Sequence, residues 1–275
     1  MRLEYLKEGV VMLPGGVVLE DGHCFRSATL RPLAGREEEW LAHHPQTPNA
    51  AKVTWLLQAC LLELDDAPVT LELVRQLLVG DRDYLVLQLR RFTLGDDIHA
   101  VIRCPACENK MDTDFRASEV AVESRPQTAA AYTLNVSDRV VRFRLPTGGD
   151  QETVLGMPDE AAADELFNRC LLDDGGKKLS AEERLATIEV MERLAPHVEL
   201  ELDLTCPDCN HRFLQPFDTT AYFFDELSVN SKQLLREVHA LALYYHWSES
   251  DILSLRRDRR REYLGLLHDS LRPQV

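Results

Sequence analysis

The chain alternates between segments with helical spacing of apolar residues and segments with strand-like alternation. Residues 50–95 have the helical pattern, and the run 53–62 is apolar on nearly every side, which suits a buried helix. Thr70 is placed to cap a second helix that Gly80 ends, and Asp81 is placed to cap a third helix. Three helices with short connections predict a helix–helix packing unit.

The first 50 residues are rich in turn formers. Two glycine-containing turns bracket the apolar run 17–19, which predicts a short hairpin or an edge strand. The segment 30–40 leads into a short helix, and a proline-rich run over 43–49 ends it.

Strand-like alternation begins at Ile98 and returns further along the chain. The predicted strands cover 98–103, 111–115, 132–136, 140–145 and 198–204, and the third and fourth of these form a hairpin. Further helices are predicted over 158–172, from a capping box at Ser180 to just before Pro196, along the tail to Tyr245, and from 249 to 267.

The charge balance narrows the class of partner. The chain has 31 Lys and Arg against 46 Asp and Glu, a net charge of −15. This acid excess disfavours a general surface for nucleic acid or anionic membrane, because both repel it. No stretch approaches the ~20 apolar residues of a membrane span, and the start lacks the basic lead and apolar core of a secretory signal. We therefore expect a cytoplasmic protein whose seven cysteines are metal ligands or core residues.

Two segments of the chain match each other around a Cys-Pro-x-Cys turn. Residues 103–115 and 205–217 each continue a predicted strand into that turn, and each places a phenylalanine eight residues past the second cysteine. We interpret the two segments as an internal duplication of a zinc knuckle.

The spacing within each pair suits metal binding. A C-x-x-C turn at a strand end points both sulfurs at one centre. Two pairs, Cys104 with Cys107 and Cys206 with Cys209, complete a four-thiolate tetrahedron, which suits Zn²⁺ or iron rather than Mg²⁺ or Ca²⁺. Such a site has no open position for water or substrate, so we expect one structural zinc ion. The alternative is an unmetallated or redox dithiol, although a redox pair typically opens a helix.

The two pairs depart from a simple zinc ribbon. About a hundred residues separate them, where roughly 15–20 are usual. After the second cysteine, where a left-handed backbone favours glycine, the chain has Glu108 and Asn210, and asparagine tolerates that conformation better than glutamate. His211 is a competing candidate ligand.

These features predict an α+β fold in which helical N-terminal and C-terminal parts surround a split zinc-ribbon-like β unit. A hairpin and two helices form an insertion within that unit. The corresponding parts of the chain are 1–97, 98–218 and 219–275.

The other cysteines and histidines have simpler explanations. Cys60 and Cys170 lie on apolar helix faces and are expected in the core. Cys24, which follows His23, lacks partners for a metal or nucleophile role and is also expected in the core. The pair His43-His44 lies in the proline-rich run and is expected to be solvated.

The sequence carries no recognisable catalytic motif of the phosphate-loop, dinucleotide, zinc-protease or serine-hydrolase kind. We therefore expect neither enzymatic activity nor a small-molecule substrate. The arginine-rich run 256–261 is a candidate nucleic-acid surface, and the alternative is a helix face paired with acidic neighbours, which the net charge favours. A candidate partner-binding cluster, with the protein core as the alternative, consists of Tyr222, Phe223, Phe224, Tyr244, Tyr245 and Trp247.

Several short segments, taken in order, resemble one protein family. They are 13–16 with 21–23, then 30–39, 80–85 and 89–96 ahead of the first knuckle, 144–152 between the knuckles, and 236–242 with 244–249 in the tail. Together they resemble the T-even phage baseplate hub assembly chaperone family, in its zinc-knuckle-bearing form from contractile phage tails and contractile injection systems. The departures are Ala34, where we expect a hydroxyl, and the missing knuckle glycines.

The resemblance implies a non-enzymatic protein that assists assembly of a baseplate or hub in the bacterial cytoplasm. Its expected partners are baseplate, hub, spike or tail-tube proteins. Two alternatives stay open: a resident structural subunit retained in the assembled particle, and a zinc-ribbon protein that binds nucleic acid.

Overall fold

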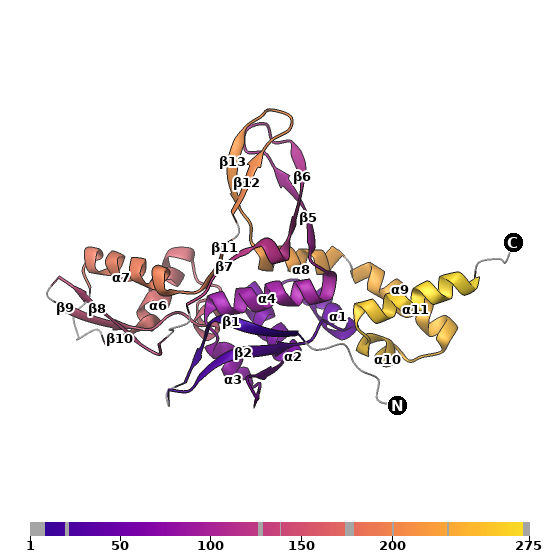
Figure 1. Ribbon diagram of the computed structural model, residues 1–275, viewed down its shortest axis with the longest axis horizontal. Helices are drawn as coiled ribbons and strands as arrows, with labels where there is room; N and C mark the ends of the chain where they lie inside the picture. The colour runs from indigo at the N-terminus through magenta and orange to yellow at the C-terminus, as the bar shows by residue number, and fades with distance from the viewer. Residues whose placement is uncertain are drawn as a thin grey trace. The chain divides into compact units, whose positions relative to one another are not determined.

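A computed structural model of the chain describes residues 9–19, 22–125, 129–137, 139–173, 179–199, 201–229 and 231–271. Helices and small antiparallel sheets follow one another along the chain, which confirms the α+β class (Figure 1). The chain divides into two compact units, and each unit is assembled from three separated segments.

The first unit contains residues 1–30, 50–86 and 121–199. Its three antiparallel sheets have the strand orders β1-β2-β3-β4, β10-β9-β8 and β11-β7. The strands are β1 Gly9–Val18, β2 Cys24–Leu30, β3 Leu61–Leu64, β4 Ala67–Pro68, β7 Ala121–Glu123, β8 Tyr132–Val136, β9 Arg139–Phe143, β10 Leu171–Asp173 and β11 His197–Glu199. The helices are α2 Asn49–Cys60, α3 Leu71–Gln76, α5 Gly148–Thr153, α6 Asp159–Cys170 and α7 Ala181–Leu194, together with the first part of α4 Val79–Leu94.

The second unit contains residues 31–49, 87–120 and 200–275, and it includes the rest of α4. Its strands form two separate hairpins, β5 Asp97–Arg103 with β6 Lys110–Arg116, and β12 Glu201–Thr205 with β13 Arg212–Pro216. Its remaining helices are α1 Gly35–His43, the 3₁₀ turn Ala117–Glu119, α8 Thr219–Val229, α9 Ser231–Tyr245, α10 Glu249–Ser254 and α11 Arg257–Leu271.

Each unit has its own apolar core. In the first unit, α6, α7 and β9 bury a cluster made of Leu78, Phe143, Leu145, Phe167, Cys170 and Met191. In the second unit, α9 and α10 bury a cluster made of Leu234, Val238, Leu241, Ile252 and Leu253. Burial of such side chains is the main favourable term that holds each set of helices together.

Several predicted helix ends agree with the structure. Thr70 caps α3 by accepting from the Leu73 N–H, 3.2 Å away. Ser180 and Glu183 form the predicted capping box at the start of α7. The short helix α1, which the sequence also predicts, ends at His43.

The prediction that Gly80 ends one helix and Asp81 caps the next is wrong. Both residues lie inside α4, which begins at Val79. The Asp81 carboxylate instead accepts hydrogen bonds from the backbone N–H groups of Gly15 and Gly16, at 2.7 and 2.9 Å. A tertiary contact therefore replaces the local cap, and burial raises the pKa of Asp81 to about 6, although those two N–H donors oppose the rise.

Three other predicted boundaries also differ. The alternating run 198–204 forms two strands, β11 and β12, which pair with different partners, β7 and β13. The last predicted helix divides into α10 and α11 around Leu255. The short helix α5, which the sequence analysis did not predict, follows β9.

We find no helix in the described residues with the length and apolar character needed to span a bilayer.

Candidate metal centre

The two Cys-Pro-x-Cys turns have the same backbone geometry. In the first turn, the Cys104 N–H donates to the Asn109 carbonyl and the Glu108 N–H donates to the Cys104 carbonyl, both at 2.9 Å. In the second turn, Cys206 makes the two equivalent bonds, with the His211 carbonyl and the Asn210 N–H, also at 2.9 Å. The predicted duplication is therefore visible as two equivalent knuckles, each between the strands of a hairpin.

Both knuckles contain a left-handed residue directly after the second cysteine. Glu108 has φ of 61° and Asn210 has φ of 58°. Glycine and asparagine adopt this conformation readily, whereas other residues pay roughly 1–2 kcal/mol for it. The first knuckle is therefore strained at Glu108, as the sequence predicted from the missing glycine.

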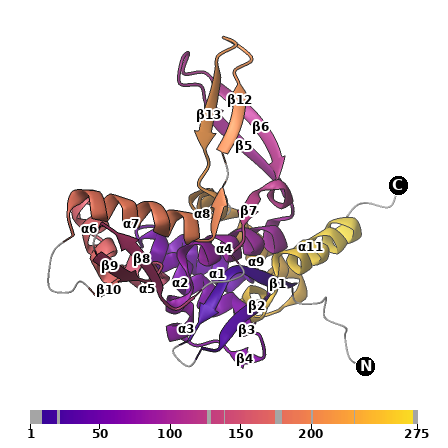
Figure 2. The same cartoon turned by 60° about the vertical axis from the view of Figure 1, so that its left-hand side comes forward.

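The two hairpins bring all four knuckle cysteines together, as the side-by-side hairpins in Figures 1 and 2 indicate. The Sγ atoms of Cys104 and Cys209 are 3.7 Å apart, and those of Cys107 and Cys206 are 3.6 Å apart. All four sulfurs lie within 4.8 Å of one another. The cross-pairs join residues that are 105 and 99 positions apart in the sequence.

These distances fit a tetrahedral metal site. Zinc–sulfur bonds of about 2.3 Å in a tetrahedron place the sulfurs about 3.8 Å apart. The sulfur–sulfur distances of the two cross-pairs, 3.6 and 3.7 Å, agree with that edge and are far longer than the ~2.05 Å of a disulfide. All seven cysteines lie in the described part of the chain, and all seven are free thiols. The donor set therefore suits a thiophilic metal ion.

The knuckle backbone also favours thiolate at one of the four sulfurs. Burial raises the pKa of the Cys104 thiol, but hydrogen bonds from the Cys107 and Ala106 N–H groups and from neighbouring thiols outweigh it and lower the pKa to about 7. At Cys107, the Asn109 N–H lowers the pKa, while burial and the other three thiols raise it more, to about 12. A metal ion binds the thiolate form, so its binding at these sulfurs would release protons.

A small apolar cluster and one polar contact surround the sulfurs. Met111 is buried beside Cys104 and Cys206, and the cluster is completed by Ile102, Leu204 and Phe213. The Asn109 side chain donates to the Asp208 carboxylate at 2.9 Å, which joins one knuckle to the other. This amide–carboxylate contact could not be predicted from the repeat, because the two residues occupy different places in their turns.

The repeated phenylalanines lie at the far ends of the two hairpins from the sulfurs. Phe115 and Phe217, each eight residues past the second cysteine, make an edge-to-face contact with ring centroids 5.2 Å apart. Tyr222 on α8 packs against Phe217, and its hydroxyl donates to the His99 carbonyl at 2.6 Å. The hairpins are therefore joined at two places, at the sulfurs and at this aromatic pair.

The other candidate residues have separate positions. Among the described residues, the group of close ligand atoms consists of the four cysteines without His211, whose ring stacks on Phe213. Cys60 and Cys170 are buried in the core, as predicted. The core prediction is wrong for Cys24, which is only half-buried at the start of β2. His43 and His44 are exposed, as predicted.

The arginine run at 256–261 is not a uniform exposed face. Arg260 is fully buried in ion pairs with Glu38 and Glu237, at 2.7 and 3.0 Å. Arg257 is buried beside Glu38 as well. Two of the five arginines are therefore structural, because each lies against a buried carboxylate.

The aromatic candidates for partner binding lie mostly in the core. Phe223 and Phe224 are buried in α8. Tyr245 and Trp247 are partly buried and stack on each other, with ring centroids 4.9 Å apart. Tyr244 is the exposed member, with 49 % of its surface accessible.

The chain was compared with models of known protein families. A family model for the T4 bacteriophage base plate protein matches residues 25–225, well over half of the chain and including both knuckles. The chain belongs to this family. The baseplate family match supports a phage baseplate-related role with partners among baseplate proteins. Comparisons with curated proteins and with solved structures find no match.

Proposed function

We propose that this baseplate-family chain is a non-enzymatic zinc protein that assists assembly of the baseplate or hub of a contractile phage tail or contractile injection system. It would act in the cytoplasm of the producing cell and bind hub, spike or tail-tube proteins. The zinc-binding part of this proposal is based on the four thiols that two equivalent knuckles bring close together. The family match supports the baseplate part.

The chemistry of the donor set supports a structural ion. Four protein thiolates fill all positions of a tetrahedron, so no position is left for water or a substrate. Cys104 and Cys206 are buried, which limits exchange of the ion with solvent. The zinc would join two segments that are about a hundred residues apart, and its binding free energy would add to that of folding.

Metal analysis of the purified chain tests the zinc assignment. We expect about one zinc per chain, with iron or an empty dithiol site as the outcomes that contradict it. Cys104→Ser and Cys209→Ser should each release the ion and lower the stability of the hairpins. Cys24→Ser is the matched control, because Cys24 is a half-buried thiol outside the four-cysteine group. A metal-free protein with full stability would refute the structural role.

Purification of the mature particle tests the assembly role. If the chain is an assembly chaperone, we expect it to be bound to assembly intermediates and to be absent from the finished particle. Recovery of this chain at a fixed stoichiometry in the finished particle would instead make it a resident subunit. Affinity capture from cells that carry the surrounding gene cluster would identify the partner.

Nucleic-acid binding is the weaker alternative. The buried ion pairs of Arg257 and Arg260 leave a smaller basic surface than the sequence suggested. Salt-dependent binding to DNA or RNA that is lost when Arg256, Arg259 and Arg261 are neutralised would favour it.

A further inference from the structure

The four knuckle cysteines differ in how much of each residue solvent can reach. Cys104 and Cys206, the first cysteine of each knuckle, are 0 % and 1 % exposed. Cys107 is half-buried, and Cys209 is exposed. The two knuckles are therefore equivalent in backbone geometry but not in access, because the second knuckle presents its second cysteine to solvent.

Access decides which of the four sulfurs reacts first once they hold a metal ion. A coordinating thiol is deprotonated outright, so all four sulfurs are then thiolates and protonation does not distinguish them. Thiolates rather than thiols react with oxidants, and their oxidation follows thiolate character and exposure. The exposed Cys209 is therefore the knuckle sulfur that a peroxide reaches first.

A sulfur in contact with that of Cys209 comes from the other knuckle. The Sγ atoms of Cys104 and Cys209 are 3.7 Å apart, and those of the second cross-pair, Cys107 and Cys206, are 3.6 Å apart. Each knuckle sulfur thus has a contact partner on the other hairpin. To reach the ~2.05 Å of a disulfide, the sulfurs of Cys104 and Cys209 would have to approach each other by about 1.6 Å.

We propose that Cys209 is the oxidation site of the metal centre, and that the product is a disulfide with Cys104, which links the two hairpins after the ion has left. This inference concerns the regulation of the site described under the proposed function and rests on its zinc assignment. The second cross-pair, Cys107 with Cys206, keeps its two thiols when one equivalent of oxidant is supplied.

The reaction balances with one peroxide molecule for each disulfide. The Cys209 thiolate attacks one peroxide oxygen, the O–O bond breaks, and the products are a sulfenic acid and hydroxide. The Cys104 thiolate then attacks the sulfenic sulfur, the S–O bond breaks, and a second hydroxide leaves as the S–S bond forms. The two sulfurs give two electrons to the peroxide. Two of the four metal ligands are lost, which releases the ion.

A disulfide between the knuckles has a different consequence from simple loss of the metal. Cys104 follows β5 and Cys209 precedes β13, so a bond between them joins one hairpin to the other. Removal of the ion by a chelator under reducing conditions breaks the link at the sulfurs. Oxidation exchanges that link for a covalent one. The hairpins therefore stay joined in an oxidising environment, where disulfides persist.

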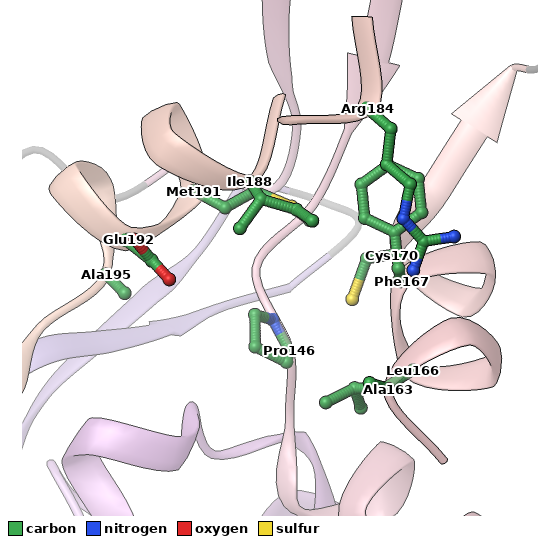
Figure 3. Close-up of a pocket in the computed structure, with 10 residues that line it drawn as sticks. All are labelled: Pro146, Ala163, Leu166, Phe167, Cys170, Arg184, Ile188, Met191, Glu192 and Ala195. Carbon is green, nitrogen blue, oxygen red and sulfur yellow. The ribbon is translucent and has the colours of Figure 1, made fainter. Parts of the chain in front are cut away.

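The three cysteines outside the metal centre provide internal references. Cys170 lies beside Phe167 in the wall of an apolar pocket of about 370 Å³, which α6 and α7 line for the most part (Figure 3). Burial raises the pKa of Cys170 to about 11, so it stays a thiol at neutral pH and reacts slowly. Cys60 is buried, and Cys24 is half-buried. We expect all three to stay reduced while Cys209 is oxidised.

Peptide mapping of the zinc-loaded, full-length chain tests the proposal. The protein is treated with one equivalent of hydrogen peroxide, the remaining thiols are blocked with N-ethylmaleimide, and the denatured chain is digested with trypsin. Trypsin cleaves after lysine and arginine, so the two knuckles fall in separate peptides, 104–110 and 194–212. We expect these peptides to be joined by a disulfide between Cys104 and Cys209, with about one zinc ion released for each disulfide.

Limited proteolysis gives a second readout of the same link. We expect the hairpins of the peroxide-treated protein to be cut at least fivefold more slowly than those of protein treated with a chelator and a reductant, because proteolysis follows the population of the opened form. Dithiothreitol and zinc together should restore the original protein. Cys24→Ser is the matched control, and it should change neither the linked peptides nor the release of zinc.

Three outcomes would overturn the proposal. The first is a disulfide within one tryptic peptide, between the two cysteines of a single knuckle. The second is oxidation of Cys24 before Cys209. The third is a protein that keeps its zinc and its four reduced thiols in millimolar peroxide, which would leave the zinc assignment in place. Conversely, a purified chain without zinc that forms the linked peptides would refute the zinc assignment and support the oxidation site.

Discussion

Gly80 occupies a place in α4 where a distant segment passes directly against the helix. A β-carbon added to Gly80 would lie 1.7 Å from the Pro196 carbonyl oxygen and 2.5 Å from its carbonyl carbon. Ordinary contact begins at 3.4 Å, and the obstacle is backbone, so rotation of a side chain cannot relieve it. Pro196 directly precedes β11, which is held by its pairing with β7.

The size of the effect follows from two opposing terms. Replacement of glycine by alanine inside a helix normally stabilises by ~1 kcal/mol. At Gly80 the neighbouring backbone must also move by ~2 Å, and because the obstacle is backbone we take the upper end of the usual overpacking cost, ~3 kcal/mol. We expect Gly80→Ala to destabilise the first unit by ~2 kcal/mol, which corresponds to a fall of ~4–8 °C in its melting temperature.

Gly265→Ala in α11 is the matched control. A β-carbon there meets no atom within 4 Å, so only the helix propensity changes and the variant should gain ~1 kcal/mol. Thermal unfolding followed by circular dichroism measures both variants, with zinc held constant. A Gly80→Ala protein as stable as the parent would refute the reasoning, because it would mean that the segment at Pro196 is not held in place.

Three further predictions concern single residues. Glu108→Gly should stabilise the first knuckle by ~1 kcal/mol in urea unfolding, whereas Asn210→Gly should change little, because asparagine already tolerates φ of 58°. Burial raises the pKa of Asp81 to about 6 from its ordinary 3.8, so the folded chain takes up a proton that the unfolded chain lacks. The unfolding free energy should therefore rise by ~1 kcal/mol between pH 7 and pH 5 relative to Asp81→Asn, and a flat difference would contradict it. Burial and Arg144 act in opposite directions on Asp150, and the hydrogen-bonded arginine holds its pKa well below the ordinary range. The ionised Asp150 carboxylate stabilises the folded chain above pH ~4, and this contribution is lost progressively as the pH falls below that value. The unfolding free energy of Asp150→Asn should therefore fall less than that of the parent between pH 5 and pH 3.

The sequence predicted the four-cysteine cluster because the signal there is local and repeated. A few consecutive residues determine the conformation of each Cys-Pro-x-Cys turn. The second copy of the motif identifies the two cysteines that complete a set of four. The positive φ at Glu108 could be inferred in the same way, from the place where a glycine is usual. What the spacing does not encode is the contact between the turns, such as that of Asn109 with Asp208.

The errors arose where a tertiary contact replaced a local one. Gly80 and Asp81 have the residue types of a helix stop and a cap, yet α4 continues through both. The carboxylate of Asp81 instead accepts hydrogen bonds from the N–H groups of Gly15 and Gly16, which are 66 and 65 residues away in the sequence. Likewise, the alternation over 198–204 predicts strands but does not name the partner of each, so a change of sheet within the run cannot be read from it.

Helix periodicity also gave no sign of buried charge. Arg257 and Arg260 look like members of an exposed basic run, and their burial depends on Glu38 and Glu237 from two other helices. A buried ion pair is stable only when both partners are present and hydrogen-bonded. One of the two carboxylates that pair with Arg260, that of Glu38, lies more than two hundred positions earlier in the chain.

A metal ion at the four thiols would add to a small set of contacts that joins the two hairpins. β5–β6 and β12–β13 are two-stranded, and an isolated two-stranded hairpin is marginal in water. Apart from the Phe115–Phe217 contact, the cluster around the sulfurs has only a few apolar side chains. The larger clusters at Phe143 and at Leu241 lie elsewhere in the chain and include none of the four thiols. A metal at the four thiols would therefore close a loop of about a hundred residues with its own binding free energy, and its loss should loosen the hairpins before it affects either of those cores.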